Sequence, residues 1–161
     1  EFQAPGAARE IARIVDESGI DGCYLTDHPA PSSHWLRNTV GGHDALDPFT
    51  GLAWLAAASD RVMLISNIVV LPYRNPFITA KAAASLQLLS GNRFILGVGV
   101  GYQKAEFDAL GVPFERRGAL TDEAIGNRQQ AHRLNRGESR ARHLDSRSPA
   151  STARPSGSPS R

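Results

Sequence analysis

The sequence of 161 residues has a single cysteine, Cys23, so it cannot form an internal disulfide. A lone thiol favours a reducing compartment, and we therefore expect a cytoplasmic protein. No uninterrupted apolar run approaches the ~18 residues of a membrane-spanning helix, and the polar start EFQAPGAARE is unlike a signal peptide. The sequence also lacks a Walker-type phosphate loop and a G-x-S-x-G elbow. Its histidines match no zinc-ligand spacing, so we expect no metal.

The formal charge of +2 hides an uneven distribution along the chain. Residues 1–125 contain ten basic and fourteen acidic side chains, whereas residues 126–161 contain eight arginines and two acidic residues. The second segment has no Val, Ile, Phe, Trp, Tyr or Met, and Leu134 and Leu144 are its only large aliphatic residues. Such a composition cannot bury enough apolar surface to offset the entropy cost of ordering, so we expect a disordered tail.

Three explanations of this tail remain open. Its abundance of Arg, Ser and Pro is typical of a shifted reading frame in GC-rich DNA, which is the interpretation that we favour. A true disordered extension is the second explanation, and a nucleic-acid-binding arm is the third. The arm has no aromatic side chains to stack on bases, so we expect no nucleic-acid partner.

Apolar periodicity predicts three helix–strand pairs in the first hundred residues. Asp47-Pro48 and Asn75-Pro76 each combine a helix N-cap with a proline at the first helical position. The predicted helices cover residues 5–18, 48–59 and 76–89, the predicted strands cover 22–28, 61–71 and 93–100, and residues 29–46 form a long loop.

The spacing of the strands is that of repeated βα units with parallel strands. The last two predicted strands are almost continuously apolar, which is typical of strands covered on both faces. The fold class is therefore α/β, and both a doubly wound sheet and a (β/α)₈ barrel fit this pattern.

Each predicted strand ends in polar residues or glycine. In both folds the carboxyl ends of parallel strands meet at one rim, where ligands bind. We therefore expect a ligand site at this rim. The residues that the three strands deliver there are Thr26, Asp27 and His28, then Pro72, Tyr73 and Arg74, then Gly99, Gly101 and Tyr102.

Asp27 and His28 are candidates for a proton-handling pair, because histidine titrates near neutral pH. The alternative is that Asp27 caps the following loop and His28 is an ordinary loop residue. Asn67 interrupts an apolar strand, where a buried amide without partners costs roughly 1–3 kcal/mol. It is either a satisfied core residue or part of a strand irregularity that presents backbone to a ligand.

Gly97, Gly99 and Gly101 follow the spacing G-x-G-x-G, whereas a dinucleotide-binding loop requires G-x-G-x-x-G after its first strand. The glycines either let a flat ligand approach the main chain or allow tight packing inside a barrel. Trp35 lies in the long loop, and such loops often carry function. We assign Trp35 and Tyr73 to substrate binding.

Four blocks resemble the luciferase-like monooxygenase superfamily, especially its F420-dependent branch: TDHPAPSSHWL, GGHDALDPF, NIVVLPYRNPF and LSGNRFILGVGVGYQKAEFDALGVPFERR. The resemblance implies a partial (β/α)₈ TIM barrel over residues 1–125, with about three of eight strands, followed by the disordered tail over residues 126–161. It also implies a truncated chain, since the family's first strand and a starting Met are missing. Unpaired strand edges favour assembly into a homo-oligomer.

The resemblance further implies an oxidoreductase that binds coenzyme F420, or alternatively FMN, and acts on a small organic substrate by hydride transfer or oxygenation. A non-catalytic, incomplete fragment of such an enzyme is the alternative. The family often has a bulged strand with a non-proline cis peptide, and Asn67-Ile68 is the matching place. The residues implied are Asp27 and His28 for catalysis, and Asn67, Ile68, Gly99, Gly101 and Tyr102 for the cofactor.

Overall fold

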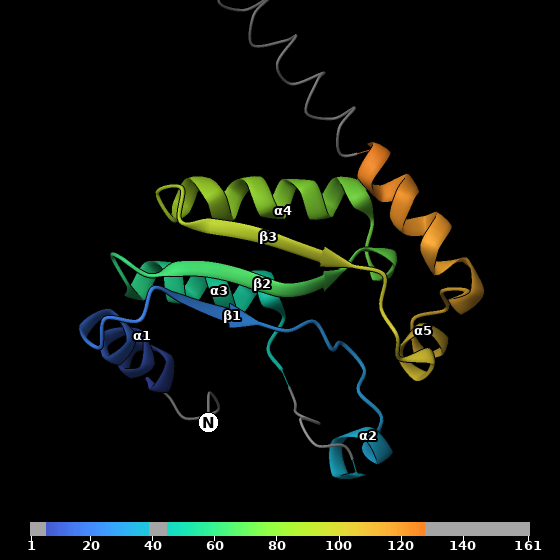
Figure 1. Cartoon of the computed structure of the whole chain (residues 1–161), viewed down its shortest axis with the longest axis horizontal. Helices are drawn as coiled ribbons and strands as arrows, with labels where there is room; N and C mark the ends of the chain where they lie inside the picture. The colour runs from blue at the N-terminus through green and yellow to red at the C-terminus, as the bar shows by residue number, and fades with distance from the viewer. Residues whose placement is uncertain (1–5, 39–44, 128–161) are drawn as a thin grey trace, which may run out of the picture. The chain divides into compact units, whose positions relative to one another are not determined.

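The computed structural model describes residues 6–38 and 45–127, so the predicted tail lies outside it from residue 128 onward. Three parallel strands form one sheet in the order β1-β2-β3 (Figure 1). The parallel arrangement predicted from the strand spacing is therefore confirmed. The strands are β1 (Gly22–Leu25), β2 (Met63–Val70) and β3 (Phe94–Gly99), and the helices α1 (Ala7–Glu17), α3 (Pro48–Ala58) and α4 (Pro76–Leu89) precede them in turn.

Both N-cap signals are confirmed. The Asp47 carboxylate accepts the N–H of Thr50 at 2.9 Å at the start of α3. The Asn75 side chain accepts two N–H groups of the first turn of α4, at 3.0 and 3.3 Å. These bonds satisfy donors that a helix start leaves without partners, which is why both helices begin where the sequence predicts.

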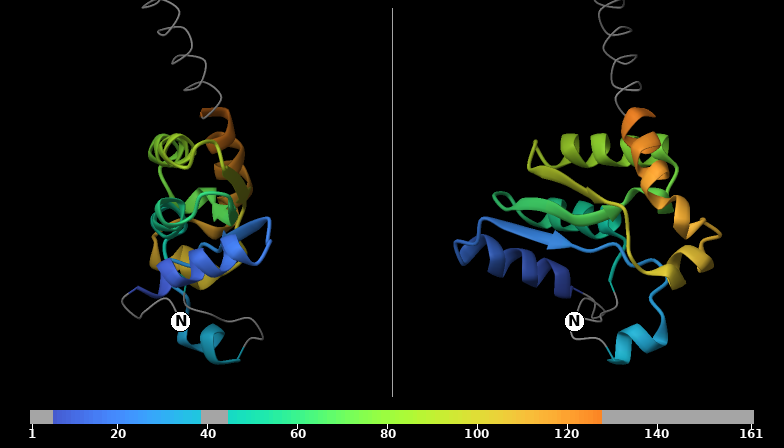
Figure 2. Two further views of the ribbon diagram at one scale, coloured as in Figure 1. Left: turned by 90° about the vertical axis from the view of Figure 1, so that its left-hand side faces the viewer. Right: turned by 45° about the vertical axis from the view of Figure 1, so that its right-hand side comes forward.

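Helices α3 and α4 cover one face of the sheet (Figure 2). Tyr24 and Ile95 both align with Ile65 and so lie on the opposite face, where they are 61% and 48% exposed. Among the described residues no helix covers this face (Figure 2). The expectation of strands covered on both faces is thus wrong for this part of the chain. In a closed barrel, side chains of further strands would fill this inner face. The core on the helix side consists of Ala12, Leu52, Leu55, Ala56, Leu64, Ala83, Leu86 and Phe94.

The loop predicted over residues 29–46 contains a short helix, α2 (Ser33–Asn38). The hydroxyl oxygen of Ser32 accepts the N–H of Trp35 at 3.2 Å. Serine is common both in loops and at helix starts, so composition alone did not reveal this helical turn.

Asn67 is exposed, so of its two alternatives the satisfied core residue is wrong. The buried polar residue of this strand is Ser66, whose hydroxyl donates to the carbonyl of Gly97 at 2.9 Å and accepts its N–H at 3.0 Å. The pairing of β2 with β3 shifts register between Ser66 and Val69. This shift confirms the strand irregularity, and it accounts for the outward position of Asn67.

Asp16 in α1 holds the turn that leads into β2. Its carboxylate accepts the N–H of Asp60 at 2.8 Å and that of Val62 at 3.2 Å. The hydrogen bond from Asp60 lowers the pKa of Asp16 and outweighs the opposing effect of burial. The ionised form of Asp16 is therefore the form that ties α1 to β2.

Replacing Asp16 with asparagine is expected to weaken the acid dependence of folding. An aspartate with a lowered folded pKa stabilises the fold above its unfolded value of about 3.9, and loses this contribution as pH falls through the folded value. Urea unfolding between about pH 3 and 7 measures the difference in the free energy of unfolding between the parent and Asp16→Asn. We expect a constant difference above about pH 5 that shrinks below about pH 4. A difference independent of pH would contradict this role.

Candidate active site

His28 follows β1 and is joined to the segment that follows β3. Its Nδ1 lies 3.3 Å from Oε2 of Glu106 and 3.3 Å from the amide nitrogen of Gln103. Gln103 is the N-cap of the short helix α5 (Lys104–Ala109), which contains Glu106. The His28 side chain is 11% exposed. The ends of the first and third strands thus meet at this histidine.

Glu106 is the buried centre of the cluster, with a side chain only 1% exposed. Its Oε2 accepts the hydroxyl of Tyr73 at 3.1 Å, and its Oε1 accepts the N–H of Ala30 at 3.4 Å. Tyr73 ends a short 3₁₀ helix, η1 (Leu71–Tyr73), which directly follows β2. A buried carboxylate is costly without such partners, and here the segments after all three strands supply them.

The protonation of Tyr73 follows from its surroundings. Burial raises the pKa of Tyr73, and the charge and hydrogen bond of Glu106 raise it further. Tyr73 therefore stays protonated at neutral pH, and its hydroxyl donates a hydrogen bond to Glu106. A proton on Nδ1 of His28 that is shared with Glu106 makes Nε2 the basic nitrogen of the neutral ring. In that tautomer the Gln103 amide must turn its oxygen towards Nδ1.

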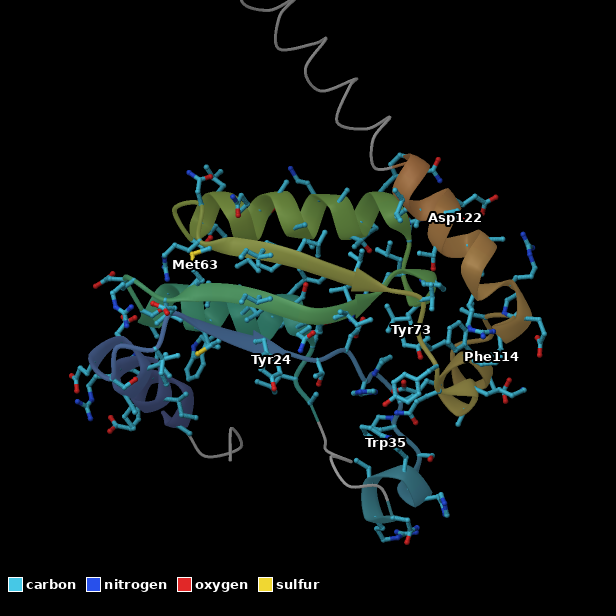
Figure 3. The ribbon with its side chains drawn as sticks, viewed as in Figure 1. Tyr24, Trp35, Met63, Tyr73, Phe114 and Asp122 are labelled. Atoms are coloured by element: carbon cyan, nitrogen blue, oxygen red, sulfur yellow. The ribbon has the colours of Figure 1, made fainter. Side chains whose placement is uncertain are left out.

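Aromatic side chains surround the imidazole of His28. The ring centre of Trp35 lies 4.5 Å from that of His28, with 39° between the two ring planes. The ring centre of Tyr102 lies 6.4 Å from that of His28, in an edge-on arrangement. Figure 3 shows Trp35 and Tyr73 at the end of the sheet towards which the strands point. The structure therefore brings together three residues that the sequence placed at the rim, His28, Tyr73 and Tyr102, and Trp35, which the sequence placed in the long loop.

The carboxylate of Asp27 has other partners than its neighbour in the sequence. The side chain is 1% exposed and accepts the N–H of Val70 at 3.0 Å. It also accepts Nη2 and Nε of Arg74, at 2.6 and 3.3 Å. These contacts join the end of β1 to the end of β2. They favour the interpretation of Asp27 as a residue that holds the backbone.

Asn67 and Ile68 lie on β2, and the peptide bond between them is cis, at the place that the resemblance implied. The side chain of Ile68 lies against Gly99, where an added Cβ would collide with its Cδ1. A Cβ on Gly97 would collide with the carbonyl oxygen of Ser66. Close packing thus explains both glycines.

Gly101 has a φ of +76°, which is costly for any residue with a side chain. A Cβ there would also lie 2.7 Å from Val70 and 2.9 Å from Phe107. Packing is therefore sufficient to require glycine here as well. Cofactor binding by Gly99 and Gly101 stays a prediction.

Glu106 and Gln103 are the two residues of the cluster that the sequence analysis missed. A glutamate early in a short helix reads as a surface residue, because acidic side chains are common in the first turn. The signal that was available is position, since both residues follow the third strand within a few positions of its carboxyl end. In residues 6–38 and 45–127 no group of His, Cys, Asp or Glu could hold a metal ion, and no helix is long and apolar enough to cross a membrane.

The sequence profile of a family described as "Luciferase-like monooxygenase" matches residues 2–159. The chain belongs to this family, as its sequence blocks indicated. One relative is an F420-dependent glucose-6-phosphate dehydrogenase of Kineococcus radiotolerans, which is 35% identical over 132 residues. The matched region covers 81% of this chain and 36% of that protein. The chain spans about a third of the length of the curated relatives that it matches.

Solved structures agree on the fold. A monooxygenase from Streptomyces bottropensis is similar with a TM-score of 0.66 at 25% identity, over 76% of this chain and 35% of that one. The coenzyme F420-dependent tetrahydromethanopterin reductase from Methanopyrus kandleri gives a TM-score of 0.53 at 26% identity, over 70% and 28%. The three strands and their helices are therefore part of a luciferase-like (β/α)₈ barrel, and the doubly wound alternative is wrong.

Proposed function

We propose that this chain carries the proton-handling corner of the active site of an F420-dependent oxidoreductase acting on a small organic substrate, with FMN as the alternative cofactor. The observation that carries the proposal is the meeting of His28, Tyr73 and Glu106 from the ends of three successive strands. The names of two similar proteins, which include F420, support the choice of cofactor.

The residues that would hold the cofactor fit a planar heterocycle with a polar edge. The amide of Asn67 is exposed beside the apolar surface that Ile68 forms over Gly99. Tyr102, with 68% of its surface exposed, lies at the end of the neighbouring strand. Apolar walls with a few placed polar groups are typical of cofactor sites. A bound deazaflavin supplies a ring carbon that exchanges hydride, and FMN would add reactivity towards O₂.

His28 is the group proposed to move the substrate proton. In the tautomer with its hydrogen on Nδ1, His28 donates to Glu106, and Nε2 is then the base when a substrate hydroxyl is oxidised and the acid in the reverse direction. Tyr73 and Ala30 donate to the same carboxylate and fix its orientation. Trp35 covers one side of the imidazole and limits its access to water.

A non-catalytic fragment is the second candidate, and the uncovered face of the sheet favours it. The exposed Tyr24 and Ile95 mark the sheet face that a closed barrel would fill. Ile78, Leu88 and Leu89 on α4 are 70%, 79% and 74% exposed, which supports self-association. A cytoplasmic location stays a prediction from the lone Cys23.

Titration of the full chain with F420, and separately with FMN, tests the proposal. We expect saturable binding of F420 and a higher unfolding temperature, with about 2.7 kcal/mol of stabilisation at a hundredfold excess over Kd. Asn67→Ala is expected to weaken binding about tenfold, the worth of one good hydrogen bond. Glu17→Gln on the exposed side of α1 is the control and should leave binding unchanged.

Sedimentation velocity on the same samples reports the state of assembly. A cooperative thermal transition without binding of either cofactor would contradict the enzyme proposal and favour the fragment. Binding of FMN alone would move the assignment to the alternative cofactor.

A further inference from the structure

Arg74 joins two carboxylates that are far apart in the sequence. Its Nη2 and Nε donate to Asp27 at 2.6 and 3.3 Å, and its Nη1 lies 2.8 Å from Oδ2 of Asp47. The guanidinium lies 5.7 Å over the ring of Phe49, and the side chain is 25% exposed. Both edges and one face of the planar group are therefore in use, a geometry that lysine cannot reproduce.

Each of the two carboxylates also holds the backbone. Asp27 accepts the N–H of Val70 at the end of β2, and Asp47 accepts the N–H of Thr50 at the start of α3. Arg74 thereby ties the end of β1, the end of β2 and the start of α3 to one another. The network leaves little freedom at the point where the chain departs from β1.

The charges of Arg74 and Asp47 persist over the ordinary pH range. Burial opposes the charged form of Arg74, but the two aspartates outweigh it and raise the pKa of the guanidinium. Burial likewise opposes ionisation of Asp47, but the N–H of Thr50 and the charge of Arg74 lower its pKa. The contacts of Arg74 are thus ion pairs in partial shelter from water, where they are screened less than surface pairs.

The residues next to this network are those of the candidate site. His28 directly follows Asp27, and Trp35 lies on the chain between Asp27 and Asp47. The bond from His28 to Glu106 is 3.3 Å long, beyond the usual 2.7–3.2 Å, so a small displacement of the backbone breaks it. Because His28 directly follows Asp27, a displacement of Asp27 would move the imidazole relative to Glu106.

We propose that Arg74 is a positioning residue of this site: by holding Asp27 and Asp47 together, it places His28 and Trp35 against Glu106. Asp27 acts through this network and does not itself transfer a proton. The inference concerns the same site as the proposed function, but its test needs no cofactor, so the two fail separately.

The fluorescence of Trp35 reports this placement. Trp35 and Trp54 are the two tryptophans, so the full chain with Trp54→Phe has Trp35 as its single emitter. A protonated imidazole quenches an indole that it touches, so acidification should change the emission while the contact is intact. Glu106, Gln103 and Tyr102, which lie close to His28, and Tyr73, which donates to Glu106, are the same in every variant. His28→Gln sets the baseline.

Arg74→Gln is expected to lose at least half of the amplitude of this pH-dependent change. Arg61→Gln is the matched control, because the guanidinium of Arg61 likewise joins separate segments, here through the carbonyls of Val15, Asp16 and Ile20, but lies at the opposite end of the strands. It should lose stability in urea and keep the full amplitude. A residue with a merely structural role would lower stability without changing the amplitude.

Two milder variants keep the test decisive if Arg74→Gln does not fold. Arg74→Lys keeps the charge without the fork, and Asp47→Asn keeps an N-cap for α3 without the ion pair. Each is expected to lose part of the amplitude. Full amplitude in all Arg74 and Asp47 variants that fold, or an equal loss in Arg61→Gln, would overturn the inference. A loss confined to the Arg74 network, in a chain that binds no cofactor, would support it and refute the proposed function.

Discussion

Replacing Gly97 with alanine is expected to disrupt the pairing of β2 with β3. The new Cβ would collide with the carbonyl oxygen of Ser66, a backbone atom of the neighbouring strand that cannot rotate away. Ser66 also holds Gly97 through its hydroxyl, at 2.9 and 3.0 Å, so the strands cannot separate without losing both bonds. We expect a loss of at least about 3 kcal/mol, the upper end of the usual cost of overpacking. Far-ultraviolet circular dichroism and urea unfolding measure it.

Gly118→Ala is the matched control for this substitution. Gly118 lies in the helical residues 117–127, and a Cβ there meets no atom within 4 Å. Alanine in an open helical position should stabilise the fold by about 0.5–1 kcal/mol. Parent-like stability of Gly97→Ala would show that Gly97 and the Ser66 carbonyl do not approach each other this closely in solution.

Glu106→Gln is expected to lower the turnover of the F420-loaded chain by about 10²–10⁴-fold, the usual contribution of general acid–base catalysis. The amide keeps the shape of the carboxylate but removes the charge that orients Nδ1 of His28. Cofactor affinity should change little, because Asn67 and Ile68 are the residues proposed to hold the ring. Stopped-flow absorbance of the deazaflavin separates the two effects.

A second measurement on Glu106→Gln is independent of activity. Burial raises the pKa of Tyr73 first, and the charge and hydrogen bond of Glu106 raise it further, so removing the charge should lower it. Alkaline titration of tyrosinate absorbance shows the shift, and Tyr73→Phe identifies the signal. An unchanged pKa of Tyr73 would contradict the contact on which the proposed mechanism rests. If Glu106→Gln changes neither the pKa of Tyr73 nor the turnover, Glu106 is not part of the active site.

Much of the fold was predictable because its signals are local. The N-caps Asp47 and Asn75 act on residues two and three positions away, so helices 48–59 and 76–89 appear in the structure as Pro48–Ala58 and Pro76–Leu89. The helix α2 was missed because serine, here Ser32, is common in loops as well as at helix starts. The exposure of Asn67 was missed because it depends on the register of β3, which no residue of β2 encodes.

The candidate site was predictable in part. The rule that parallel strands end at one rim placed His28, Tyr73 and Tyr102 near one another before any distance was known. It could not rank polar residues beyond the strand ends, so Glu106 was passed over, and the choice between a proton-handling and a backbone-holding role for Asp27 was left open. The difference between these two acids lies in their partners, which are an arginine and a backbone N–H for Asp27 and a histidine and a tyrosine for Glu106.

The sequence by itself determined the order of helices and strands, the parallel sheet and the family of this chain, because caps, apolar periodicity and motif spacing are properties of neighbouring residues. Only the tertiary structure decided which carboxylate faces His28, since Glu106 is 78 residues away and reaches it when α5 packs beside the end of β1. It also decided that Gly97, Gly99 and Gly101 are required by packing against β2 and α5. Such contacts depend on the distances between chain segments, and spacing along the sequence does not contain them.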